Sequence, residues 1–144
     1  MLRETFPNFK FSEPATADML VQAELVLGVP IPEKLKEIYR ECDGFSEDKS
    51  NAQYLFPLLG SSSLLEITPF LWQEFEDVFP KFSLTGYIFF GSSCCDHYFG
   101  INSKAPFNLI QYHHHMEGTW EDHGKDILEM YKGDYCRFDD AGAV

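Results

Sequence analysis

The stretch "AELVLGVPIPEKLKEIYRECDGF", residues 23–45, predicts two helices separated by a short break. Gly28 ends the first helix, because glycine favours the left-handed backbone that follows a helix, and Pro30 cannot continue it. Pro32 suits the first position of the second helix, and Gly44 is expected to cap its end. The buried face of this second helix is marked by four residues at helical spacing: Leu35, Ile38, Tyr39 and Cys42.

The first helix of this pair begins at Thr16. Its expected apolar face follows the same periodicity and consists of Met19, Leu20, Ala23, Val26 and Leu27. Two amphipathic helices cannot cover each other's apolar faces completely, so the pair needs a further layer. The sequence predicts that this layer is a sheet.

Strand-like segments follow the helical pair. "YLFPLL", residues 54–59, and "SLLEI", residues 63–67, are predicted as strands around a polar "GSSS" turn, with Pro57 confining the first to an edge or bulge. Thr68 and Pro69 are typical of a helix start, and the third helix they predict turns Leu71, Phe75, Val78 and Phe79 inward.

The remaining pattern predicts the centre of the sheet. "GYIFF", residues 86–90, is apolar on both faces, as in a central strand. "HYFGIN" and "FNLIQYHH" are predicted as antiparallel neighbours, and a short last helix contains Ile127, Leu128 and Tyr131. The expected fold is therefore one α+β domain, with a mostly antiparallel sheet packed against the N-terminal helical pair, one inserted helix and one C-terminal helix.

These elements also predict the domain limits. Residues 15–133 form the expected domain. Residues 1–14 are expected to be an irregular arm with room for a short strand at "NFKF", and residues 134–144 a tail.

The chain is strongly acidic, with a formal net charge of −12 and a pI of about 4.6. The balance is −1 over residues 1–40 and −11 over residues 41–144. Such a field repels nucleic-acid phosphates and anionic lipid and attracts a basic partner, although many acidic surfaces serve solubility alone. The composition therefore disfavours direct nucleic-acid or membrane binding.

Four cysteines, at positions 42, 94, 95 and 136, match no compact disulfide framework. The N-terminal stretch lacks a continuous apolar segment, and no apolar run reaches the roughly 18 residues that cross a bilayer. We therefore expect reduced thiols and a cytoplasmic location.

The segment "GSSCCDHYFGIN", residues 91–102, resembles a reactive cluster. In a strand, however, alternation places Cys95 and His97 on one face and Cys94 and Asp96 on the other. Two ligands are too few for structural zinc unless His113 and His115 complete the site from the next strand. A Cys95–His97 dyad would also need an orienting third group. We predict no metal, no cofactor and no catalytic residue.

The stretch "EGTWED", residues 117–122, places Trp120 among the carboxylates of Glu117, Glu121 and Asp122. Tryptophan is enriched in binding hot spots, so Trp120 is a candidate anchor. A buried tryptophan at a sheet edge is the alternative.

The helical pair resembles the signature of the SUKH superfamily, the group of Smi/Knr-type domains. The residues that match are Glu24, Leu27, Gly28, Ile31, Pro32, Leu35, Ile38, Tyr39, Asp43 and Gly44. Downstream, "IFFGSSCCDHYFGIN" resembles a second family block through Gly91, Asp96, Tyr98 and Phe99, and departs from it at residues 92–95. "KDILEMYKGD" resembles the closing helix, so the resemblance covers about residues 15–133.

This resemblance implies a non-enzymatic intracellular domain that binds a protein. Bacterial members resemble immunity proteins that neutralise toxins, often nucleases, and fungal members act as regulatory hubs. The predicted partner is a basic toxin domain, bound stoichiometrically through acidic contacts with Trp120 as anchor. The expected contact residues are Glu74, Glu76, Asp77, Asp96, Glu117, Trp120, Glu121 and Asp122.

Two alternatives remain open at this stage. One is a regulatory scaffold that binds another protein, and the other is a metal- or thiol-dependent enzyme using Cys95 and His97. The sequence does not fix the oligomeric state.

Overall fold

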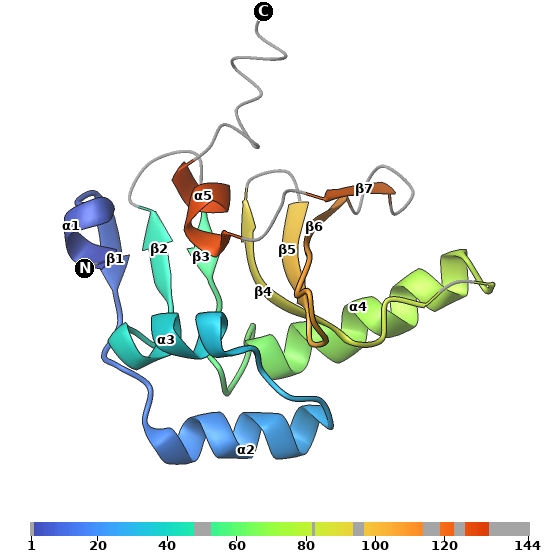
Figure 1. The fold of residues 1–144 in the computed structure, drawn as a ribbon, viewed down its shortest axis with the longest axis horizontal. Coiled ribbons are helices and arrows are strands. Elements are labelled where there is room, and N and C mark those ends of the chain that lie inside the picture. The colour runs from blue at the N-terminus through green and yellow to red at the C-terminus, as the bar shows by residue number, and fades with distance from the viewer. Residues whose placement is uncertain are drawn as a thin grey trace, which may run out of the picture.

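The computed structural model describes residues 2–47, 53–81, 83–93, 97–113, 119–122 and 126–132, with the backbone alone at 113, 119–122 and 132. Within these residues the chain forms an antiparallel sheet in the order β1-β2-β3-β4-β5-β6-β7, with helices on both faces (Figure 1). This confirms the predicted α+β class. The elements are α1 Leu2–Thr5, β1 Phe9–Phe11, α2 Ala17–Leu27, α3 Glu33–Glu41, β2 Phe45–Glu47, β3 Tyr54–Leu55, α4 Leu64–Val78, β4 Tyr87–Ser93, β5 His97–Asn102, β6 Leu109–His113, β7 Thr119–Asp122 and α5 Ile127–Lys132.

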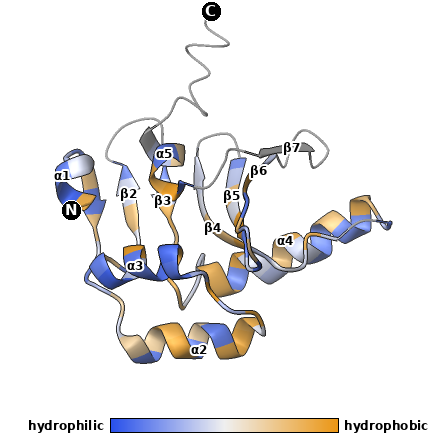
Figure 2. Cartoon of the chain, in the orientation of Figure 1, coloured by the Kyte–Doolittle hydropathy of each residue, from blue (hydrophilic) through white to orange (hydrophobic). Residues whose placement is uncertain are grey.

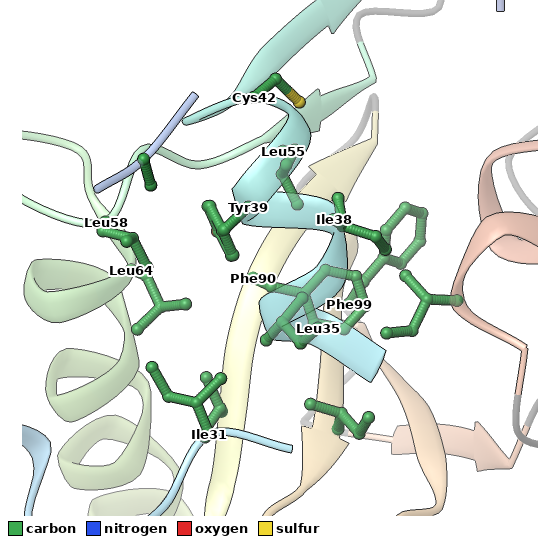
Figure 3. Packing of buried hydrophobic residues seen from close by; sticks show 14 of the residues in the cluster. Ile31, Leu35, Ile38, Tyr39, Cys42, Leu55, Leu58, Leu64, Phe90 and Phe99 are labelled. Carbon is green, nitrogen blue, oxygen red and sulfur yellow. The ribbon is translucent and has the colours of Figure 1, made fainter. Parts of the chain in front are cut away.

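The larger core lies between one sheet face and helices α3 and α5. Leu35, Ile38 and Tyr39 of α3 pack toward Phe90 and Phe99 of the central strands (Figure 3). Tyr131 of α5 contacts Phe99 edge to face, with ring centroids 5.2 Å apart. Burial of these aromatic and aliphatic side chains is the main stabilising term for the fold.

A smaller core lies on the opposite face, under α4. Leu71 and Phe75 of α4 pack against Phe89, Ile110 and Tyr112 of β4 and β6. Helices therefore cover both faces at the centre of the sheet, which explains why "YIFF" in β4 is apolar without alternation.

The helical pair forms as predicted. The Thr16 hydroxyl accepts a hydrogen bond from the Met19 N–H at the start of α2, and Gly28 ends α2 with a left-handed φ of 77°. Pro32 precedes the first residue of α3, where its missing N–H costs nothing. Val26, however, was expected to face the core and is 61% exposed.

The predicted role of Gly44 was wrong. Helix α3 ends at Glu41, the capping residue Cys42 is already in extended backbone, and Gly44 lies beyond it with a φ of 111°. A Cβ at Gly44 would lie 3.0 Å from the Leu55 carbonyl oxygen. Glycine is therefore needed here for backbone conformation and close packing against β3, not to cap a helix.

The beginning of α4 was also mispredicted. "SLLEI" belongs to the helix, since the Ser63 hydroxyl caps it by accepting from the Glu66 N–H at 3.2 Å. Thr68 and Pro69 lie inside α4, and Val78, expected inward, is 54% exposed. Of the predicted strand "YLFPLL", only Tyr54 and Leu55 form a strand, β3. This strand lies inside the sheet, between β2 and β4, and ends before Pro57.

Thr68 links α4 to the central strand instead of starting the helix. Its hydroxyl donates to the Phe89 carbonyl at 3.1 Å and accepts from the Phe89 N–H at 2.9 Å. The register of β4 against β5 shifts between Phe89 and Gly91, so this strand contains a bulge. Thr68 thus binds both backbone polar groups of Phe89 beside the bulge.

The N-terminal arm is regular rather than irregular. Its first residues form α1, and the strand expected around "NFKF" is β1, which pairs with β2. The strands "HYFGIN" and "FNLIQYHH" are confirmed as β5 and β6, paired antiparallel, and the last helix as α5. The predicted tail lies outside the described residues.

The Thr68 contact gives a stability prediction. Thr68→Val removes the hydroxyl while keeping the shape, so the buried N–H and C=O of Phe89 lose their partner. We expect a loss of about 2–4 kcal/mol in the free energy of unfolding, measured by urea denaturation. Thr68→Ser keeps the hydroxyl and loses only the methyl group, so it should cost clearly less; a Thr68→Val protein as stable as the wild type would contradict the role of these hydrogen bonds.

Candidate protein-binding surface

Helix α4 carries acidic residues near both of its ends. Its fifteen residues include Glu66, Glu74, Glu76 and Asp77 but no lysine or arginine. Leu64, Thr68, Leu71 and Phe75 face the core at helical spacing, and Leu65, Ile67 and Trp72 pack partly against it, so one side of the helix is left at the surface. Figure 1 shows α4 extending beyond the strands at one side of the molecule.

The three acidic residues predicted on this helix do not share one environment. Asp77 is exposed and accepts a hydrogen bond from the Gln73 side chain at 3.0 Å. Glu76 is half-buried and accepts from the Ser83 hydroxyl at 3.2 Å. Glu74 is half-buried on the side of Tyr112. The structure thus separates Glu76 from the other two, because residues 74 and 77, three apart, lie on one side of the helix and residue 76 does not.

An exposed aromatic side chain lies among these carboxylates and was missed from the sequence. Phe70 is 58% exposed, one turn after Glu66 and one turn before Glu74. The signal existed: a helix starting at Leu64 with Thr68, Leu71 and Phe75 inward leaves Phe70 outward. The predicted helix began at Thr68 instead, and the outward position of Phe70 was therefore missed. We call Glu66, Phe70, Gln73, Glu74 and Asp77 the α4 surface.

Glu74 is coupled electrostatically to the core. Its carboxylate accepts a hydrogen bond from the Tyr112 hydroxyl at 3.5 Å. Burial, reinforced by the negative charge of Glu74, raises the pKa of Tyr112 to about 12. Tyr112 therefore keeps its proton at neutral pH and acts as the donor.

Three of the remaining predicted contacts lie at the far edge of the sheet. Trp120, Glu121 and Asp122 belong to the edge strand β7, where Trp120 lies opposite Tyr112. Only their backbone is described. Asp96 and Glu117 lie outside the described residues. Whether these residues join the α4 surface in one patch therefore stays a prediction.

A groove of about 670 Å³ lies on the same sheet face, beside α4 and over β1 to β4. Its chemistry differs from that of the α4 surface, because serine hydroxyls and aromatic rings dominate. Asp43 lines it, and burial raises the pKa of this carboxyl although it accepts a hydrogen bond from the Leu58 N–H at 2.9 Å. The lining also includes Lys10, Ser46, Tyr54, Phe56, Ile67, Ser92 and Tyr98.

The reactive-looking residues are described only in part. His97 is buried, and its Nδ1 lies 2.8 Å from the Gln111 side-chain nitrogen. The register places His97 opposite His113, as a shared site would require, but Cys94, Cys95, His114 and His115 lie outside the described residues. Among the described residues no group of three or more potential metal ligands occurs.

Cys42 is the one cysteine that the structure describes, and its environment is apolar. Burial raises the pKa of its thiol to about 11. A thiol with this pKa carries little thiolate at neutral pH, so Cys42 is a packing residue and not a nucleophile.

Helices on both faces of an antiparallel sheet define an α+β domain. The model of the SMI1 / KNR4 family (SUKH-1) matches residues 14–131, and the chain therefore belongs to this family. A search of curated proteins finds no match. In the described part of the chain, no helix has the length and hydropathy needed to cross a bilayer.

The Glu74–Tyr112 contact can be tested directly. Glu74→Gln removes the negative charge, so the pKa of Tyr112 should fall below 12 while staying above the ordinary tyrosine value, because burial remains. An NMR titration with tyrosine labelled at the ring Cζ measures this shift. Asp77→Asn, which changes an exposed carboxylate on the same helix, should leave the Tyr112 titration unchanged; an unchanged titration in Glu74→Gln would contradict the coupling.

Proposed function

We propose that this protein is a non-enzymatic intracellular binding domain, and specifically an immunity protein that neutralises a basic toxin, such as a nuclease, by stoichiometric binding. The observation that carries the proposal is the α4 surface, a run of carboxylates without a lysine or arginine around an exposed phenylalanine. Membership of the SMI1 / KNR4 family is compatible with this role.

The mechanism is occlusion. A nuclease must present a basic surface to its phosphate substrate, and an acidic inhibitor competes for that surface. Opposite charges also speed the encounter, which matters for an inhibitor that must act before its toxin does. The net charge of −12 provides the long-range field, and the α4 surface provides local contacts.

Phe70 provides an apolar contact, which adds affinity that charged side chains alone do not. Exposed ion pairs contribute little affinity, whereas an aromatic side chain that enters an apolar hollow of its partner and loses water is typical of a hot spot. The acidic residues around Phe70 would form the rim that orients it. In this arrangement Phe70 takes the anchoring role that the sequence had suggested for Trp120.

The proposal is tested by co-expression with a toxin encoded next to this gene. The protein should rescue growth of a host that produces the toxin and should co-elute with it in a one-to-one complex on gel filtration. Absence of both rescue and complex would refute the immunity role for that pairing. Growth rescue without a complex would point to indirect regulation and would also contradict occlusion.

The charge of α4 has its own test. Asp77→Lys should slow association with the toxin and weaken binding about tenfold, since a rim charge acts mainly on the encounter rate. Glu129→Lys makes the same change in net charge on α5, which packs on the opposite sheet face, and should have a much smaller effect. Surface plasmon resonance at low salt measures both; equal effects would show that only net charge matters.

Phe70 is tested by truncation. Phe70→Ser should weaken toxin binding by about 10- to 100-fold, mainly through faster dissociation. Phe70→Tyr keeps the ring and should retain most of the affinity. Thermal unfolding of both variants should match the wild type because the side chain is exposed, and a serine variant that binds normally would remove Phe70 from the interface.

A further inference from the structure

The groove beside α4 has a floor that is built by the strand register. Strand pairing places five of the residues that line the groove directly opposite one another, in one row across β1 to β5: Lys10, Ser46, Tyr54, Ser92 and Tyr98. Paired residues point to the same face of a sheet, so these side chains form the floor of the groove. In Figure 2, β2 and β3 show both hydrophilic and hydrophobic colours, as expected where alternate residues face the groove and the core.

Two aromatic rings belong to the groove lining. Phe56 follows β3 and its N–H still donates to the Phe90 carbonyl of β4, so its side chain faces the groove as that of Tyr54 does. The centroids of the Phe56 and Tyr98 rings are 6.4 Å apart, and the rings are tilted by 52°. The face of an aromatic ring carries partial negative charge, so such a pair favours a cation or a planar group stacked on it.

The Asp43 carboxylate lines the groove without a cationic partner. Its Oδ1 accepts a hydrogen bond from the Leu58 N–H at 2.9 Å, and the residue is half-buried. Within the described ranges no lysine or arginine forms an ion pair with Asp43. Burial accordingly raises the pKa of this carboxyl. A cation brought by a ligand would compensate for the hydration that the carboxylate has lost.

The lysine of the lining lies away from Asp43. Lys10 pairs with Ser46, three residues along the chain from Asp43, so the two charges are roughly 10 Å apart at the rise of a strand. Lys10 is also exposed, and solvent and salt therefore screen its charge. Asp43, in contrast, lies against the Phe56 segment, since a Cβ on Gly44 would be 3.5 Å from the Phe56 carbonyl carbon. The groove thus has an anionic and aromatic end that suits a cation.

The groove adjoins the α4 surface. Ser61 and Ser62 line the groove where the chain approaches α4. The Ser62 N–H donates to the Glu66 carboxylate at 2.7 Å, and Glu66 is the first residue of the α4 surface. Phe70 follows one turn later. A partner that binds the α4 surface is therefore within reach of the groove.

We propose that the groove receives an arginine side chain from the protein that binds the α4 surface. The guanidinium group pairs with the Asp43 carboxylate, and its planar face stacks on the aromatic lining. Arginine suits this site better than lysine, because a flat guanidinium both stacks and forms a forked hydrogen bond. The serine hydroxyls of the lining are donors and acceptors for the backbone of the segment that carries the arginine. This inference deepens the proposed function and rests on it for the partner.

Titration of the full chain with a matched pair of peptides tests the proposal. The probe is acetyl-Ala-Ala-Arg-Ala-Ala-amide, and its control carries citrulline, which keeps the planar shape of arginine without the charge. Amide NMR spectra at about 0.05 M sodium chloride should give a dissociation constant on the order of 1 mM, with shifts at Ser46, Ser92 and Tyr98. The citrulline peptide should bind at least about fivefold more weakly. Equal binding of both peptides, shifts confined to the α4 surface, or no binding would each overturn the proposal.

Two variants with the same change in net charge locate the site. Asp43→Asn keeps an oxygen that accepts from the Leu58 N–H and removes the charge, so it should weaken binding of the arginine peptide at least about fivefold. Asp77→Asn removes an exposed carboxylate of the α4 surface and should change this binding less than about twofold. Equal weakening would overturn the assignment to the groove. Circular dichroism checks both folds, and the two peptides on the wild type decide the question if Asp43→Asn does not fold.

The peptide titration does not involve the toxin, so its outcome is separate from that of the proposed function. Peptide binding in the groove by a protein that fails to neutralise its neighbouring toxin would remove the immunity role and leave the groove as an arginine site. Neutralisation by a protein that binds neither peptide would remove the arginine site and leave the immunity role.

Discussion

The hydroxyl of Tyr39 donates a hydrogen bond to the Phe56 carbonyl oxygen at 2.6 Å, and much of the structure depends on this buried contact. Tyr39 lies on α3, and Phe56 follows β3, so the bond joins the helical layer to the sheet. Just beyond the end of α3, the Asp43 carboxylate accepts from the Leu58 N–H, and the Gly44 carbonyl accepts from the Ser12 N–H. Together these three hydrogen bonds fix the positions of the N-terminal linker, the helical pair and the segment that leads into α4 relative to one another.

Contacts of this kind also explain the identity of several signature residues of the family. Glu24 holds the break between α2 and α3 through the Ile31 N–H, Tyr39 and Asp43 bind backbone groups of the segment after β3, and Gly44 packs against Leu55. These contacts are structural. A signature of this kind identifies the fold and does not by itself identify a binding surface.

The two surface helices differ in a way that follows from their packing. Helix α4 is fixed to β4 by Thr68 and by Trp72, whose indole N–H donates to the Tyr87 carbonyl at 2.7 Å, so its carboxylates are held on a rigid element. Helix α2 pairs its Glu24 with Lys36 and exposes aliphatic side chains. The two helices therefore present different chemistry to the solvent, carboxylates on α4 and mainly aliphatic groups on α2.

The sequence by itself determined the helical pair, the central strands and the overall acidity, because periodicity, glycine and proline act locally and charge simply adds. It could not place Thr68, whose cap-like chemistry before a proline serves a contact with Phe89, 21 residues away in the chain. Nor could it show that Val26 and Val78, both expected to face the core, are exposed. Those facts depend on which side of each helix meets the sheet, and only the tertiary packing decides that.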